Sequence, residues 1–90
     1  MDREEALDLC RRWLPFWTGN RPEELVEAYS DDVFHRDPAV PDGIHGKPAL
    51  LAYLRKLLQR FPAWVWRADD VFPVQDGFVL RWKAVIPLLI

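Results

Sequence analysis

The stretch from Tyr29 to Leu54, with the sequence YSDDVFHRDPAVPDGIHGKPALLAYL, constrains the fold more than any other part of the chain. It predicts that a helix end gives way to a short strand over 33–37, which is closed by Pro38. A loop rich in proline and glycine is then expected up to Gly46. Pro48 fits the first turn of the longest helix, because its missing N–H would have no partner there.

Side chains alternate along a strand, so the residues of 33–37 fall on two faces. Val33, His35 and Asp37 share one face, while Phe34 and Arg36 share the other. If the first face looks into an apolar cavity, Asp37 is a desolvated carboxylate with an imidazole beside it. This pair predicts a site of proton transfer.

The hydrophobic pattern predicts three helices and two further strands. Apolar residues that recur at steps of three and four indicate helices over 3–16, 22–29 and 47–60. Asn20 is expected to cap the second helix. Strands are predicted over 64–74 and 78–88, joined in a hairpin whose Gly77 takes a positive φ. Asp69 and Asp70 interrupt the alternation of the earlier strand, which predicts a bulge.

Helices that precede antiparallel strands indicate an α+β fold in a single domain over 1–90. The chain has 90 residues, half of them apolar, so a core can form without disulfides or metals. Its five Trp, five Phe and two Tyr are many for this length. They fill the core, or they line a pocket for flat apolar molecules.

Charge and cysteine content exclude several classes of function. A net charge of −2 without a basic run gives little reason to expect binding to nucleic acid or to an anionic membrane. Cys10 is the only cysteine, so no disulfide forms within the chain. The acidic N-terminus lacks the apolar region of a signal peptide, and the apolar C-terminal run is too short to span a membrane. We therefore expect a soluble cytoplasmic protein.

Four segments carry a resemblance to a known family: YSDDVFHRDP, then GIHGK before a helix, RFPAWVW at 60–66 and DGFVLRW at 76–82. Together they resemble the nuclear transport factor 2-like superfamily, and most of all its SnoaL-like and ketosteroid-isomerase-like branch. The resemblance covers nearly the whole chain and implies one SnoaL-like domain. In that family a curved antiparallel sheet wraps around the long helix as a cone, with a cavity at its mouth. The family fold has further C-terminal strands, so we expect a shortened member or a partner chain that covers the sheet edge.

The resemblance also implies a role for Asp37. Ketosteroid isomerases carry their general base, an Asp, in a context that Asp37-Pro38-Ala39-Val40 matches. Burial is expected to raise the pKa of Asp37, unless a protonated His35 lowers it. Trp13 or Leu14 stands where such isomerases place an oxyanion-holding Tyr, and their second donor would lie beyond Ile90. Steroid isomerisation itself is therefore not expected.

The candidate catalytic residues are Asp37 and His35. The candidate ligand-binding residues are aromatic: Trp13, Trp17, Phe34, Tyr53, Trp64, Trp66 and Trp82. No metal site is expected, because the position of His45 relative to the strand is unconstrained. No P-loop or dinucleotide fingerprint is present, and no cofactor is expected.

Two interpretations of function remain open on this pattern. One is a cofactor-independent isomerase or cyclase that acts on a small carbonyl or polycyclic compound. The other is a non-catalytic ligand-binding or dimerisation module of the same fold, or a shortened inactive member of the family. In either case the expected partners are a small apolar molecule and a second copy of the chain, because the apolar tail over 85–90 leaves a hydrophobic edge.

Overall fold

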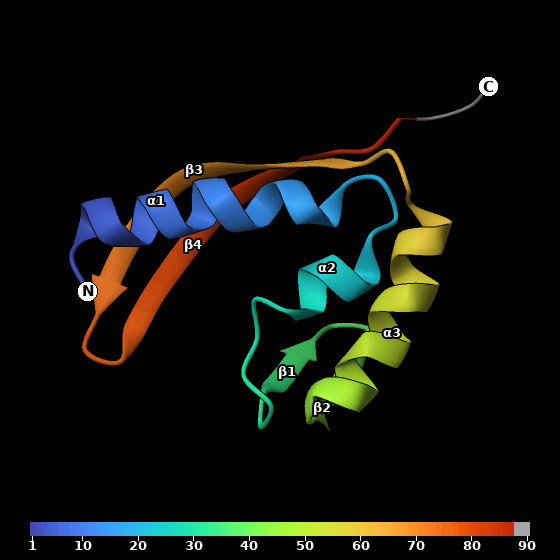
Figure 1. Cartoon of the computed structure of the whole chain (residues 1–90). Coiled ribbons are helices and arrows are strands. Elements are labelled where there is room, and N and C mark those ends of the chain that lie inside the picture. The colour runs from blue at the N-terminus through green and yellow to red at the C-terminus, as the bar shows by residue number, and fades with distance from the viewer. Residues whose placement is uncertain (88–90) are drawn as a thin grey trace.

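The computed structural model describes residues 1–87 and shows helices packed on antiparallel strands (Figure 1). The predicted α+β class is confirmed. Along the chain the elements are α1 (Arg3–Trp13), the 3₁₀-helix η1 (Leu14–Trp17), α2 (Pro22–Val26), β1 (Phe34–Asp37), β2 (Val40–His45), α3 (Lys47–Arg60), β3 (Val65–Val74) and β4 (Gly77–Val85). The last three residues of the expected apolar tail, 88–90, lie outside the described part of the chain.

Within residues 1–87 the strands form two separate two-stranded sheets, β1–β2 and β3–β4. The expected loop up to Gly46 is wrong, because 40–45 forms β2 and pairs with β1 in antiparallel register. Phe34 lies opposite His45, and the register shifts between His35 and Asp37. The pattern VPDGIH hides this strand, since three of its six residues are typical turn formers.

The first two helices end earlier than their periodicity predicts. Asp2 caps α1 by accepting a hydrogen bond from the Glu5 backbone N–H at 2.8 Å. The chain then tightens into η1, because Pro15 has no N–H to continue the α-helical ladder. Asn20 does not cap α2: its φ is 53°, and the capping position belongs to Arg21.

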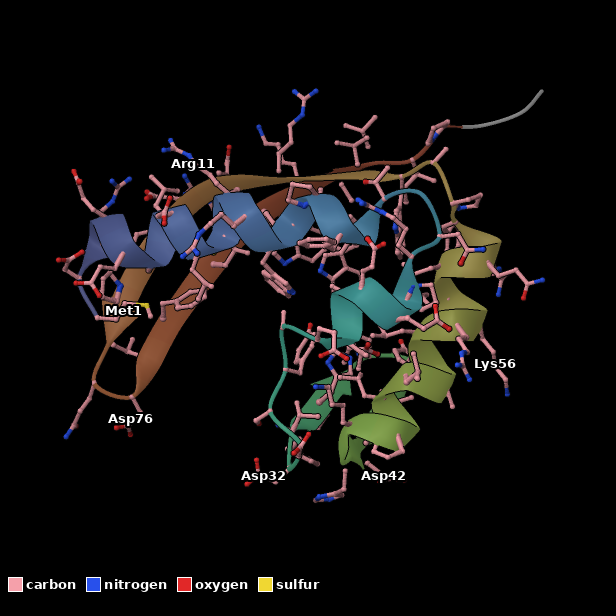
Figure 2. All side chains as sticks on the ribbon, in the orientation of Figure 1. Met1, Arg11, Asp32, Asp42, Lys56 and Asp76 are labelled. Atoms are coloured by element: carbon pink, nitrogen blue, oxygen red, sulfur yellow. The ribbon has the colours of Figure 1, made fainter. Side chains whose placement is uncertain are left out.

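The prediction for α3 is confirmed at both ends. Leu50, Leu54 and Leu58 recur every four residues and are all 0% exposed, so they form one buried stripe. This stripe packs toward α2 and β2 rather than toward the β3–β4 hairpin. Figure 2 shows side chains projecting into the space between the C-terminal half of α1 and α2.

The β3–β4 hairpin lies along α1 (Figure 1) and presents its inner face to that helix. The predicted bulge is confirmed as a register shift between Ala68 and Asp70. Gly77 pairs with Val74 at the strand ends and has no positive φ, so that part of the hairpin prediction is wrong. The bulge keeps Trp66 and Val71 on the inner face although they are five positions apart, an odd step that would place them on opposite faces of a regular strand.

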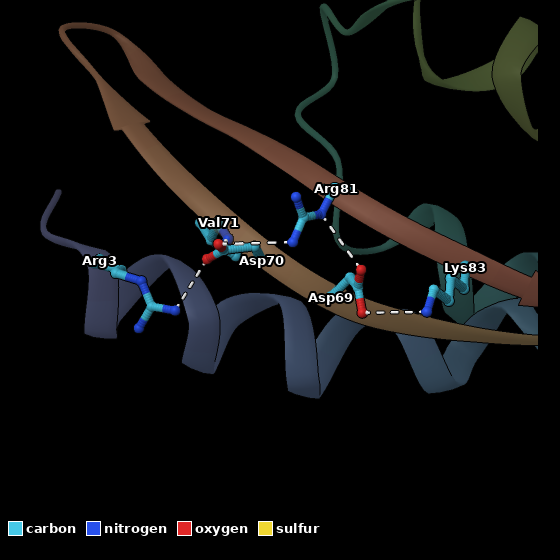
Figure 3. A network of polar contacts seen from close by, with 6 residues as sticks. All are labelled: Arg3, Asp69, Asp70, Val71, Arg81 and Lys83. Atoms are coloured by element: carbon cyan, nitrogen blue, oxygen red, sulfur yellow. Dashed lines mark hydrogen bonds and ion pairs between the residues drawn. The ribbon is translucent and has the colours of Figure 1, made fainter.

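A band of charges crosses the outer face of this hairpin (Figure 3). Asp69 on β3 accepts from Arg81 at 3.3 Å and lies 3.9 Å from Lys83 on β4. Asp70 binds Arg3 of α1 at 3.0 Å. The band is thus acidic on β3 and basic on β4.

Candidate functional site

One apolar cavity is lined by most of the residues that the sequence analysis selected. Its volume is about 570 Å³, and it opens between α1–η1, β1, α3 and the inner face of β3–β4. Its walls are predominantly apolar: Trp13, Leu14, Trp17, His35, Asp37, Pro38, Ala39, Tyr53, Leu57, Trp64, Trp66, Phe78, Leu80 and Trp82. A concave apolar space with a few convergent polar groups is the usual form of a small-molecule site.

All five tryptophans of the chain lie in this wall. Their rings meet at steep angles: Trp13 and Trp17 at 78°, and Trp64 and Trp66 at 86°. Trp66 also lies 4.3 Å from Trp82 between ring centroids. Trp64 is fixed in place because its Nε1 donates to the Trp17 carbonyl at 2.6 Å.

Two of these indole N–H groups lack a hydrogen-bond partner within the described residues. The Nε1 groups of Trp17 and Trp66 are buried, and neither has a hydrogen-bond partner among residues 1–87. A buried donor without a partner costs about 1–3 kcal/mol.

Asp37 is the polar centre of the site and receives four hydrogen bonds. Its Oδ2 is bonded to His35 Nε2 and accepts from the Tyr53 hydroxyl, both at 2.8 Å. Its Oδ1 accepts from the backbone N–H groups of Ala39 at 2.8 Å and Val40 at 3.2 Å. The turn after β1 therefore holds one carboxylate oxygen, and α3 and β1 hold the other.

These bonds overturn the expected pKa of Asp37. Burial raises the pKa, but the hydrogen bonds from His35, Tyr53 and Ala39 favour the charged form and lower it below its usual value overall. Tyr53 changes in the opposite sense. Burial and its bond to the Asp37 carboxylate raise the pKa of Tyr53 to about 12, so its hydroxyl keeps its proton.

The imidazole of His35 has two nitrogens, and the hydrogen bond to Asp37 uses only one of them. Its Nε2 is bonded to Asp37, and among residues 1–87 its Nδ1 has no hydrogen-bond partner. Its side chain is 20% exposed and lines the cavity beside Tyr53, whose ring centroid is 5.7 Å away. A neighbouring carboxylate favours the tautomer with the proton on Nε2, which leaves the Nδ1 lone pair able to accept a proton.

The structure brings eight of the nine predicted site residues to one cavity. The exception is Phe34, which is 52% exposed and packs against His45 with the ring centroids 4.5 Å apart. The alternation of β1 explains this, because Phe34 lies on the face opposite His35 and Asp37. His45 is exposed and does not reach the cavity.

Sequence reasoning missed several apolar wall residues. Phe78 and Leu80 alternate with Trp82 on β4, and Leu57 follows Tyr53 one helical turn later, so their spacing could have indicated them. No cluster of three His, Cys, Asp or Glu side chains suited to a metal occurs in the described residues. Over the same residues, no helix combines the length and apolarity needed to cross a membrane.

A comparison with protein-family models matches residues 10–87 to the SnoaL-like domain. This match includes the whole cavity wall and the C-terminal end of α1. The chain belongs to the SnoaL-like family. Through it, the chain belongs to the nuclear transport factor 2-like superfamily, as the resemblance implied. No match is found among curated proteins.

Proposed function

We propose that this SnoaL-like domain binds a small apolar ring compound in its aromatic cavity and moves a proton on it without a cofactor. The observation that supports this most is the hydrogen-bonded cluster of Asp37, His35 and Tyr53 in the wall of an otherwise apolar cavity. Polar groups that converge on apolar space are suited to general acid–base chemistry. The reaction class is isomerisation or cyclisation through loss of a proton from a carbon next to a carbonyl.

The cluster favours a division of roles. His35 accepts the proton at Nδ1, because Asp37 is held ionised by four donors and is a weak base. Asp37 orients the imidazole and stabilises the imidazolium that forms. Tyr53 positions the carboxylate and remains protonated. Asp37 is therefore a positioning residue, and His35 is the proposed catalytic residue.

A second candidate is a ligand-binding or dimerisation module without catalysis. One observation favours it: the carboxylate of Asp37 is fully bonded, as a residue that only closes a strand and a turn would be. A chemical test separates this candidate from the enzyme, because a binding module leaves the exchange of substrate protons unchanged.

The test uses 2-tetralone, a two-ring ketone with acidic C–H groups beside its carbonyl. We expect the protein in deuterated buffer to accelerate exchange of these protons, as followed by NMR. His35→Gln keeps a polar side chain but removes the base, so the rate is expected to fall by at least about 10²-fold. Asp37→Asn is expected to lower the rate less and to shift its pH profile. His45→Gln, on the exposed side of the β1–β2 hairpin, is the matched control. Equal rates for the parent protein and His35→Gln would establish the non-catalytic candidate.

A further inference from the structure

The charge of the cavity is of one sign. Among the described residues that line it, Asp37 carries the only carboxylate, and none is a Lys or Arg. We propose that the cavity selects a cationic ligand, an apolar ring compound that carries a protonated or quaternary amine. This inference rests on the proposed function only in that the same cavity holds the ligand.

The aromatic wall supplies the first argument. The face of an indole carries negative electrostatic potential, and tryptophan binds cations better than any other aromatic side chain. Five indoles, from Trp13 to Trp82 along the chain, surround this cavity. They meet at steep angles rather than in a parallel stack, so they enclose a volume in the way that the walls of an ammonium-binding cage do.

Electrostatics supply the second argument. The groups that face Asp37 are the imidazole of His35 on β1, the hydroxyl of Tyr53 on α3 and the backbone N–H groups of Ala39 and Val40. None of them carries a permanent positive charge. The carboxylate therefore lends the cavity a net negative charge near neutral pH, and apolar walls transmit its attraction with little screening.

Matched probes give the inference a sharp test. Benzyltrimethylammonium and its uncharged carbon isostere neopentylbenzene have nearly the same shape. An apolar cavity without charge recognition prefers the neutral probe, since the cation loses its hydration on entry. We expect the opposite order, with the cation at least about tenfold tighter, when both are titrated against the indole N–H signals in NMR spectra. Benzenesulfonate, the anionic probe, is expected not to bind.

Variants of the lining residues test which side chains cause the preference for the cationic probe. Asp37→Asn keeps the shape but removes the charge, so the preference for the cation is expected to shrink. Trp82→Leu removes the most exposed wall of the cage, 50% exposed in the structure, and is expected to weaken the cation more than the neutral probe. Asp42→Asn, an exposed carboxylate outside the cavity, is the matched control and is expected to change nothing.

Each outcome decides the inference. Neutral binding as tight as cation binding would overturn it, and the deuterium exchange of 2-tetralone would still judge the proposed function separately. Failure of both probes to bind at millimolar concentration would overturn the cage outright. A cation preference that survives Asp37→Asn and Trp82→Leu would place the binding elsewhere and would also overturn it.

Discussion

At the scale of single residues, hydrogen bonding outweighs burial at the centre of the site. Asp37 is partly buried, which by itself would raise its pKa, yet hydrogen bonds from His35, Tyr53 and Ala39 reverse the direction. The bond between Asp37 and Tyr53 joins residues 16 positions apart, on a strand and on a helix. Periodicity shows that each side chain faces inward, but it cannot show which side chains meet. The sequence therefore predicted which residues line the cavity better than it predicted their protonation states.

The pKa of Tyr53 leads to a prediction about alkaline stability. Its pKa is raised to about 12 in the folded protein by burial and by the Asp37 carboxylate, against its ordinary value of 10.0. A raised pKa contributes stability that is complete below pH 10 and is lost as the pH rises toward 12. We expect Tyr53→Phe to reduce this loss in urea melts between pH 9 and 12. Tyr29, whose pKa burial also raises to about 12, is expected to account for much of the remaining loss. An unchanged alkaline slope in Tyr53→Phe would contradict this.

A glycine in the β1–β2 hairpin gives a second prediction. Gly43 has a φ of 89°, and a Cβ atom built there would overlap the ring of Phe34. Gly43→Ala is therefore expected to cost about 1–3 kcal/mol in denaturant melts, from backbone strain and displacement of the ring. Gly77→Ala is the matched control, because Gly77 has no positive φ and no heavy atom within 4 Å of its virtual Cβ. A larger loss for Gly77→Ala than for Gly43→Ala would contradict the positive φ of Gly43 and its close approach to Phe34.

At the scale of elements, regular patterns were predicted well and interrupted ones were not. The ends of α3 follow directly from a run of leucines between Pro48 and Pro62. The bulge in β3 was visible as two adjacent aspartates. By contrast, β2 has the composition of a loop and becomes a strand only because β1 lies beside it. α1 ends early because Pro15 breaks a ladder that its apolar spacing would have continued.

The buried stripe of α3 gives a prediction at this scale. Leu54 is 0% exposed in the core that joins α3 to α2 and β2, so Leu54→Ala is expected to cost about 2–5 kcal/mol. In a domain of ordinary stability that loss approaches unfolding. Gln59→Ala, at an exposed position of the same helix, is expected to change the free energy of unfolding by less than about 0.5 kcal/mol. A loss below about 1 kcal/mol for Leu54→Ala in urea melts would contradict the placement of the stripe.

At the scale of the whole molecule, the outer face of the β3–β4 hairpin has no covering element in the described chain (Figure 1). Apolar side chains flank its charged band: Phe72 is 47%, Val79 55% and Val85 51% exposed. A two-fold axis parallel to the strands would place acidic β3 of one copy over basic β4 of the other. This face therefore suits a second copy of the chain.

We accordingly expect a homodimer in sedimentation experiments at tens of micromolar, about the range in which modest interfaces form. A chain with Asp69→Lys and Asp70→Lys has a wholly basic band, and a chain with Arg81→Glu and Lys83→Glu has a wholly acidic one. Each is expected to be monomeric alone, and a mixture of the two is expected to form a 1:1 dimer. A parent protein that stays monomeric, or variants that dimerise on their own, would rule out this interface.

The close spacing of the tryptophans in the cavity wall determines the fluorescence of the protein. Trp13, Trp17, Trp66 and Trp82 form a chain with centroid distances of 5.9, 5.7 and 4.3 Å. Indoles this close share excitation energy before they emit, so light absorbed by any of them reaches the ring with the lowest excited state. Solvent contact lowers that state, which favours Trp82, the most exposed of the set. The fluorescence of the whole protein is thus dominated by one ring in the cavity wall. The emission wavelength reports whether water or another molecule lies against that ring.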